Sequence, residues 1–201
     1  MKPQSPFKTN IKEKKDYLAK VAEKVFGTKG YQSSSLQDVS AEAGISKAGV
    51  YYYFKTKEDL LYYIMIRNTD IFLDKLKRCV VENEEKGLSP QESFTKLIEI
   101  YAQHINSDQD KRSIVLRERH QLTGKRRNEL YRRERAIFRL MRSELLKIDR
   151  LDKSIDPNVS SFLIIGMSHW VGYWFKEKGA LGLDDVIRQN IRAIFRGILA
   201  K

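Results

Sequence analysis

Proline is nearly absent from the interior of this chain, and this constrains the fold more than any other feature. Two of its four prolines lie within the first ten residues, and the others are Pro90 and Pro157. Each of these two follows a residue that can cap a helix, Ser89 or Asp156, so each marks a first helical position. Apolar residues between the breaks recur at spacings of three and four, without strand-like alternation. The sequence therefore predicts an all-α fold.

The same breaks divide the chain into about nine expected helices. Capping residues, prolines and glycines mark their ends, which such signals locate to within a few residues. We expect helices at about 10–28, 35–42, 46–52, 58–85, 90–105, 109–121, 125–149, 157–177 and 184–199.

Composition indicates a soluble globular protein, because 41% of the residues are hydrophobic and 32% are charged. No apolar run approaches the roughly 20 residues of a membrane helix. The polar start of the chain lacks the apolar core of a signal peptide. A lone cysteine, Cys79, excludes an internal disulfide and fits a reducing compartment, so we expect a cytoplasmic protein.

The charge of the chain predicts a polyanionic partner, because the formal net charge is +12. This charge is unevenly distributed: residues 111–150 carry +9, whereas residues 1–60 carry +4. The most basic stretch thus lies outside the motif described next.

The segment from Leu36 to Phe54 has the pattern of a helix-turn-helix, in which two short helices cross steeply and share a small core. Gly44 lies at the turn, where a positive φ is cheap for glycine. Ser46 is placed to cap the second helix. We expect the inward positions to be Val39, Ala43, Ile45, Val50 and Tyr53.

The outer face of the second motif helix has residue types that suit DNA. Lys47 supplies charge, and Tyr51 and Tyr52 supply hydroxyl groups and flat rings. Lys57, at the start of the next helix, can reach a phosphate. Arginine is absent before residue 67, so Lys47 and Tyr51 are the candidates for polar base reading. A helix–glycine–helix corner taken alone would also fit a purely structural role.

A wider pattern closely resembles the DNA-binding signature of the TetR family, without gaps over about residues 10–62. The matching strings are Gly30-Tyr31, Ser34-Ser35-Leu36-Gln37-Asp38-Val39, Ala43-Gly44-Ile45-Ser46-Lys47, Val50-Tyr51-Tyr52-Tyr53-Phe54-Lys55 and Lys57-Glu58-Asp59-Leu60-Leu61. The resemblance implies a three-helix DNA-binding domain over 1–57 and a helical effector-binding and dimerisation domain over 58–201. It also implies a homodimeric repressor that a small effector releases from a palindromic operator.

The resemblance further implies which residues contact DNA. Ser34 and Ser35 match residues that bond backbone phosphates, Tyr51 and Tyr52 match an aromatic contact pair, and Lys57 matches a phosphate-binding lysine. Tyr53 departs from the histidine of many members, and we expect it in the core. The full expected set is Ser34, Ser35, Gln37, Ser46, Lys47, Ala48, Gly49, Tyr51, Tyr52 and Lys57.

The last two expected helices each carry an apolar stripe. They resemble the TetR dimerisation helices, which pair across a two-fold axis into a four-helix bundle. Alternatively, a monomer could bury both stripes against its own helices. The expected interface consists of Phe162, Gly166, Trp170, Ile187, Ile191, Ile194 and Phe195.

The basic run near residues 117–127 predicts a site for an anionic effector beside apolar helices, although a solvated basic face would explain it equally well. This run, with residues 168–175, resembles the TetR subgroup that responds to acyl-coenzyme A. We therefore expect an amphiphile such as an acyl-coenzyme A, whose phosphates meet arginines. The expected ligand set is Phe94, Ile98, Tyr101, Arg117, Arg119, Arg126, Arg127, Phe138, Met141 and Trp174.

Other classes of function fit less well. His104, His120 and His169 have no partner at metal-ligand spacing, and no catalytic motif is present, so we expect neither an enzyme, nor a metal site, nor a cofactor. A DNA-organising protein without a ligand is the main alternative. A peripheral membrane protein using residues 125–149 is another, but such a stripe is more often core.

Overall fold

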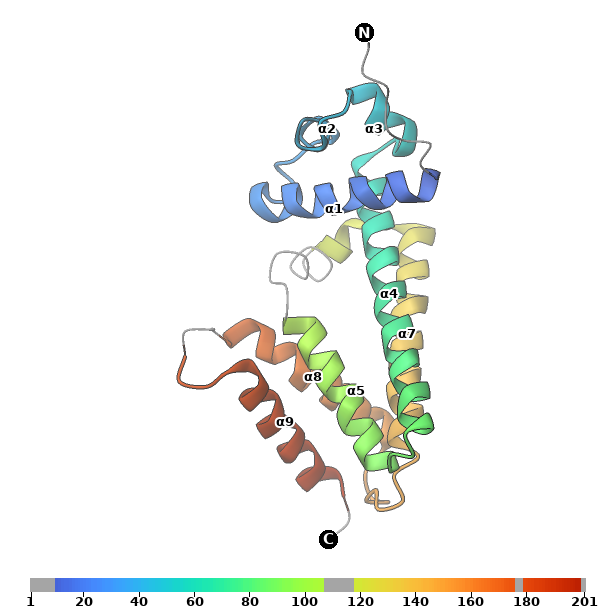
Figure 1. Ribbon diagram of the computed structural model, residues 1–201, viewed down its shortest axis with the longest axis vertical. Helices are drawn as coiled ribbons and strands as arrows, with labels where there is room; N and C mark the ends of the chain where they lie inside the picture. The colour runs from blue at the N-terminus through green and yellow to red at the C-terminus, as the bar shows by residue number, and fades with distance from the viewer. Residues whose placement is uncertain (1–9, 107–117, 176–178, 200–201) are drawn as a thin grey trace. The chain divides into compact units, whose positions relative to one another are not determined.

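The structure, a computed structural model, describes residues 10–106, 118–175 and 179–199, apart from the side chain at position 173. These residues form eight α-helices and one 3-10 turn, with a lone bridge between Leu151 and Leu199 (Figure 1). The all-α prediction is confirmed. The elements are α1 (Ile11–Lys29), α2 (Leu36–Ala43), α3 (Lys47–Tyr53), α4 (Lys57–Glu85), α5 (Pro90–Asn106), η1 (Arg119–Gln121), α7 (Gly124–Leu145), α8 (Pro157–Trp174) and α9 (Leu183–Ile198).

Two predicted helices differ from the observed elements. The helix expected at 109–121 falls mostly outside the described residues, and its described end contains η1. Helix α7 ends at Leu145, four residues before its predicted end. There Lys147 N donates to Glu144 O at 3.2 Å and Ile148 N to Leu145 O at 3.2 Å. These three-residue spacings show the helix tightening into a final turn that satisfies its last carbonyls.

The chain packs as two compact units. Among the described residues, unit 1 comprises 10–67 and 118–127, and unit 2 comprises 68–106, 128–175 and 179–199. Unit 1 includes the first turns of α4 because they bond to α1: Asp16 accepts from Tyr63 Oη at 2.9 Å and from Arg67 Nε at 2.7 Å. The functional boundary predicted between residues 57 and 58 stays a prediction.

Unit 1 has a small core around α1. Helix α1 packs against α2, which packs against α3 (Figure 1). Tyr17 Oη donates to Ala43 O at 3.2 Å and so ties α1 to the end of α2. The expected inward residues Val39, Ala43 and Val50 are buried, whereas Ile45 and Tyr53 are half-buried. Tyr53 is therefore at the edge of this core rather than within it.

Unit 2 is built around one apolar cluster from α4, α5, α7, α8 and α9. Helix α5 packs against both α8 and α9. Phe195 of α9 meets Phe94 of α5 edge to face, with ring centroids 6.4 Å apart. The expectation that α9 offers an exposed apolar stripe to a second protomer is wrong. Its stripe is buried inside the protomer itself: Ile187, Ile191, Ile194 and Phe195 all belong to the cluster.

This burial generates a stability prediction for α9. Replacing Ile194 with alanine should lower the free energy of unfolding by about 2–5 kcal/mol, because it leaves a cavity in the cluster. Replacing the exposed Arg192, in the same helix, should change it by no more than about 0.5 kcal/mol. Urea denaturation measures both values. Equal midpoints for the two variants would contradict the placement of α9.

Candidate nucleic-acid interface

The two motif helices are held by hydrogen bonds at their ends. Ser35 caps α2: its Oγ accepts from Asp38 N at 3.2 Å, and the Asp38 carboxylate accepts from Ser35 N at 2.8 Å. Gly44 ends α2 with a φ of 63°, in the left-handed region that glycine tolerates. Ser46 Oγ accepts from Gly49 N at 3.1 Å and starts α3. The corner therefore fixes the direction of α3.

The outward face of α3 presents the residues that sequence analysis expected there. Ser46, Lys47, Ala48, Tyr51 and Tyr52 are all exposed, and the Tyr52 side chain is 67% exposed. Lys47 Nζ lies 5.8 Å from the centroid of the Tyr51 ring. This face offers a cation, hydroxyl groups and small residues, which suit base edges and phosphates.

Gly49 has a packing role beside this face. A Cβ atom added there would lie 3.3 Å from Ser46 Oγ and 3.5 Å from Ile45 Cδ1. The first distance is tighter than an ordinary contact, and the oxygen concerned is the one that caps α3. A larger residue at this position would therefore require Ser46 Oγ to move by a few tenths of an ångström.

The start of α2 only partly matches the predicted phosphate site. Gln37 is exposed and Ser35 is half-buried. Ser34, however, is buried at 5% exposure, and its Oγ donates to Tyr31 O at 2.8 Å. The predicted phosphate contact of Ser34 is therefore not supported, because its hydroxyl is already used inside the protein.

The contacts of Lys57 also differ from the predicted ones. Its ammonium bonds backbone carbonyls of the turn between α1 and α2, among them Tyr31 O at 2.7 Å and Ser34 O at 2.8 Å. The structure thus gives Lys57 partners within the protein in place of the expected phosphate.

Hydrogen bonding and burial shift the pKa values of two residues beside the motif, Asp38 and Tyr31. The hydrogen bond from Lys29, assisted by Ser35, holds the pKa of the Asp38 carboxyl well below its usual range. Lys29 Nζ lies 2.6 Å from Asp38 Oδ1. Burial, with the negative charge of Glu58 adding to it, raises the pKa of Tyr31 to about 12. Asp38 is therefore ionised and Tyr31 neutral near neutral pH.

The predicted phosphate ligand Arg126 is already paired in unit 1. It forms ion pairs with Asp59 and with Glu58, the latter at 3.3 Å, and its guanidinium carbon lies 5.8 Å from the Tyr62 ring centroid. Its expected role in effector binding is therefore not supported. Of the other predicted arginines, Arg127 is exposed, Arg119 is half-buried and Arg117 lies outside the described residues.

The apolar residues predicted to line an effector site divide into two groups. Phe94, Ile98, Tyr101 and Met141 are brought together in the cluster of unit 2. Phe138 and Trp174 lie outside that cluster. Phe138 is half-buried and stacks on Phe162 with centroids 4.3 Å apart, whereas Trp174 is exposed.

A polar pair in the same region escaped the sequence analysis. Tyr101 Oη lies 2.7 Å from His169 Nε2, which joins α5 to α8. Burial, with a smaller contribution from the negative charge of Glu134, raises the pKa of Tyr101. The two residues are 68 positions apart, and no motif linked them.

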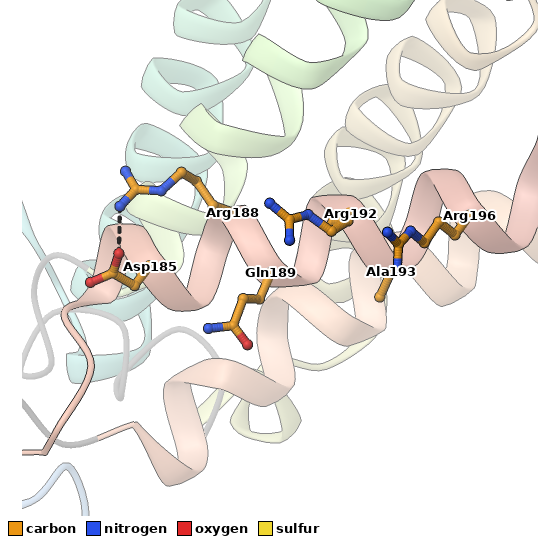
Figure 2. A pocket seen from close by; sticks show the side chains of 6 residues that line it. All are labelled: Asp185, Arg188, Gln189, Arg192, Ala193 and Arg196. Atoms are coloured by element: carbon orange, nitrogen blue, oxygen red, sulfur yellow. Dashed lines mark hydrogen bonds and ion pairs between the residues drawn. The ribbon is translucent and has the colours of Figure 1, made fainter.

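A hollow of about 450 Å³ lies on the outer face of α9 (Figure 2). Three arginines at four-residue intervals give it a charged lining, and Arg188 pairs with Asp185. None of the residues expected to bind an effector lines this hollow. The lining residues are Asp185, Arg188, Gln189, Arg192, Ala193 and Arg196.

Helix α8 has an exposed apolar face that unit 2 leaves uncovered. Phe162 and Trp170 are 64% and 65% exposed, and Gly166 lies exposed between them. A Cβ atom added at Gly166 would meet nothing within 4 Å. These three are the predicted interface residues of α8. The face also includes Val159, Leu163, Met167 and Trp174. Contiguous exposed apolar surface of this kind marks an interaction site.

The described ranges contain neither a cluster of metal-binding side chains nor a membrane-spanning helix. No three His, Cys, Asp or Glu side chains group there in a way that could hold a metal ion. None of the helices described here is long and apolar enough to cross a membrane.

Comparison with known families identifies the chain. Residues 18–64 match the bacterial regulatory proteins of the tetR family, and residues 87–198 match the tetracyclin repressor-like C-terminal domain. The second match alone covers more than half of the chain. The chain therefore belongs to the TetR family of DNA-binding transcriptional regulators.

Individual relatives agree with this assignment. YuxN, an uncharacterized HTH-type transcriptional regulator of Bacillus subtilis (strain 168), is 32% identical over 108 residues, which are 54% of this chain and 36% of YuxN. The chain thus matches about a third of the length of the first curated relatives.

Solved structures give the same fold. A TetR/AcrR-family regulator from Thermobifida fusca YX-ER1 has 27% identity and a TM-score of 0.73, covering 92% of this chain and 98% of that one. AibR, solved with isovaleryl coenzyme A and operator DNA, has 24% identity and a TM-score of 0.76, covering 90% and 97%. At the latter identity the likeness shows the fold alone.

Proposed function

We propose that this protein is a homodimeric transcriptional repressor that binds a palindromic operator and is released from it by a small amphiphilic effector. The observation that carries the proposal is the outward face of α3, which offers Lys47, Tyr51 and Tyr52 to a partner while buried Val50 anchors the helix. Membership of the TetR family supports the same function.

In the proposed complex α3 enters the major groove. Lys47 and Tyr51 contact base edges or nearby phosphates, and the small Ala48 and Gly49 allow close approach. Ser46 and Gln37 lie at the two helix starts, where exposed polar groups meet the phosphate backbone.

The occupant proposed for the exposed face of α8 is a second copy of the chain. A two-fold axis places the same face on both partners, so apolar residues meet apolar residues. Phe162 and Trp170 provide large rings, and Gly166 lets two helices approach closely. The stripe of α9 takes no direct part, since it is buried within each protomer.

The effector proposed is an acyl-coenzyme A or a similar amphiphile. Its support is the apolar region around Phe94, Ile98, Tyr101 and Met141, together with the isovaleryl coenzyme A bound by AibR. A ligand can release DNA only if it binds the DNA-free conformation more tightly. A tenfold loss of operator affinity requires a differential of about 1.4 kcal/mol.

The DNA-binding face is tested by two substitutions. Lys47→Ala and Tyr52→Ala should each weaken operator binding by about 1–3 kcal/mol. Stability should barely change, because both side chains project outward. Lys86→Ala removes an exposed charge from unit 2 and serves as the control. Mobility shift on an operator selected by the wild type measures affinity. Wild-type affinity in both variants would refute this assignment.

Assembly is tested at α8. The wild type should sediment as a dimer at micromolar concentration, with a buried area of roughly 1,200–2,000 Å² or more. Phe162→Asp or Gly166→Asp should give monomers or aggregates and abolish operator binding. Val81→Asp, which changes an exposed apolar residue of α4, should leave the dimer intact. Analytical ultracentrifugation measures this, and a monomeric wild type would overturn the proposal.

Effector chemistry is tested by titration calorimetry and operator release. A long-chain acyl-coenzyme A should bind and weaken operator binding, whereas the corresponding free fatty acid should do so much less because it lacks the phosphates. Coenzyme A alone is the matched control for the head group. If intact protein binds no acyl-coenzyme A of any chain length, the effector class is wrong.

A further inference from the structure

Lys57, the first residue of α4, makes an unusual set of contacts. Its ammonium nitrogen lies 2.7 Å from Tyr31 O, 3.2 Å from Gln32 O and 2.8 Å from Ser34 O. It also lies 4.3 Å from the centroid of the Tyr31 ring. A lysine ammonium has three N–H donors, so three carbonyls use its whole donor capacity.

The turn that Lys57 holds leads directly into the first motif helix. It follows Gly30, whose φ is 80°, and it ends at Ser35, the N-cap of α2. Tyr31 packs edge to face on Phe26 of α1, with centroids 5.2 Å apart. The Lys57 ammonium thus holds together three carbonyls of the turn that leads into α2.

Breaking the contacts between the Lys57 ammonium and the 31–34 turn would cost free energy. Tyr31 and Ser34 are buried, and Lys57 itself is half-buried. Without Lys57, Tyr31 O would keep its bonds from Ser34 N and Ser34 Oγ, whereas Ser34 O would lose a donor that lies 2.8 Å away. A phosphate in the DNA would have to compete with three carbonyls and a ring at once, whereas exposed Lys47 has an open path to a phosphate.

From this geometry we infer that Lys57 is a positioning residue for DNA binding: it holds the 31–34 turn, and thereby α2, in the DNA-binding arrangement, and it does not itself contact a phosphate. The inference rests on the proposed function, since it concerns how this motif binds its operator. It assigns Lys57 a role different from the one that family resemblance implied.

Salt dependence separates the two roles. A side chain that neutralises a phosphate releases a counterion. Each such contact makes the slope of log K against log salt concentration steeper, that is, more negative, by about 0.9. A positioning residue changes affinity without changing that slope. The probe is a duplex that the wild-type protein selects from a random-sequence pool, titrated from low to high salt.

Three variants complete the experiment. Lys57→Met should weaken binding about tenfold or more with the wild-type slope, and Lys47→Met should reduce the magnitude of the slope by about 0.9. Lys57→Arg should bind as weakly as Lys57→Met, because a planar guanidinium cannot direct its donors to three converging carbonyls, although it is a good phosphate ligand. Affinities refer to folded, active protein, whose fraction a stoichiometric titration gives.

A second route keeps the inference testable if Lys57→Met does not fold. Ser34→Ala loosens the same turn and leaves every charge in place, because only the bond from Ser34 Oγ to Tyr31 O is lost. It should weaken binding by a smaller factor with an unchanged slope. A slope whose magnitude falls by about one in Lys57→Met, or wild-type binding by Lys57→Arg, would overturn the inference. If the wild type selects no duplex, the proposed function itself fails.

Discussion

The DNA-binding motif depends on the satisfaction of helix ends. Helices α2 and α3 have only eight and seven residues, too few for either to be stable alone. Their stability comes from caps at Ser35 and Ser46, from the left-handed Gly44 between them, and from the packing of α2 on α1 and of α3 on α2. Each cap also defines a direction, so the residues that end one helix determine which side of the next one faces outward.

Helices α8 and α9 illustrate how the sequence was both informative and misleading. Helix α9 has one apolar stripe and a polar opposite face, and unit 2 uses that stripe for its own core. Helix α8 is apolar on more than one side: Ile164 and Val171 are buried while Phe162 and Trp170 are exposed. A helix with a single apolar stripe has no apolar surface left for a partner once that stripe is buried. A helix that is apolar nearly all round keeps an apolar face exposed. That distinction was available in the sequence.

Local features were predictable for a physical reason. Caps, glycine turns and helical periodicity act over a few residues, so the helices and the outward face of α3 follow from the sequence. Partners far apart in the chain were not predictable. The ion pair of Arg126 with Asp59 spans 67 positions, and the contacts of Lys57 reach back to residues 31–34. Charge, position and family resemblance marked Arg126 and Lys57 as anion ligands, because the sequence does not show which groups inside the protein they contact.

The lack of arginine in the motif has a consequence for how the proposed repressor selects its site. Lys47 and Tyr51 discriminate among bases less sharply than a forked guanidinium, so one motif alone reads its half-site weakly. A two-fold dimer reads the half-site twice, and the free energies of discrimination add. Sequence selectivity would then depend on the α8 face as much as on α3. A substitution at Phe162 that loosened the dimer would blur the choice of operator without altering any residue that reads DNA.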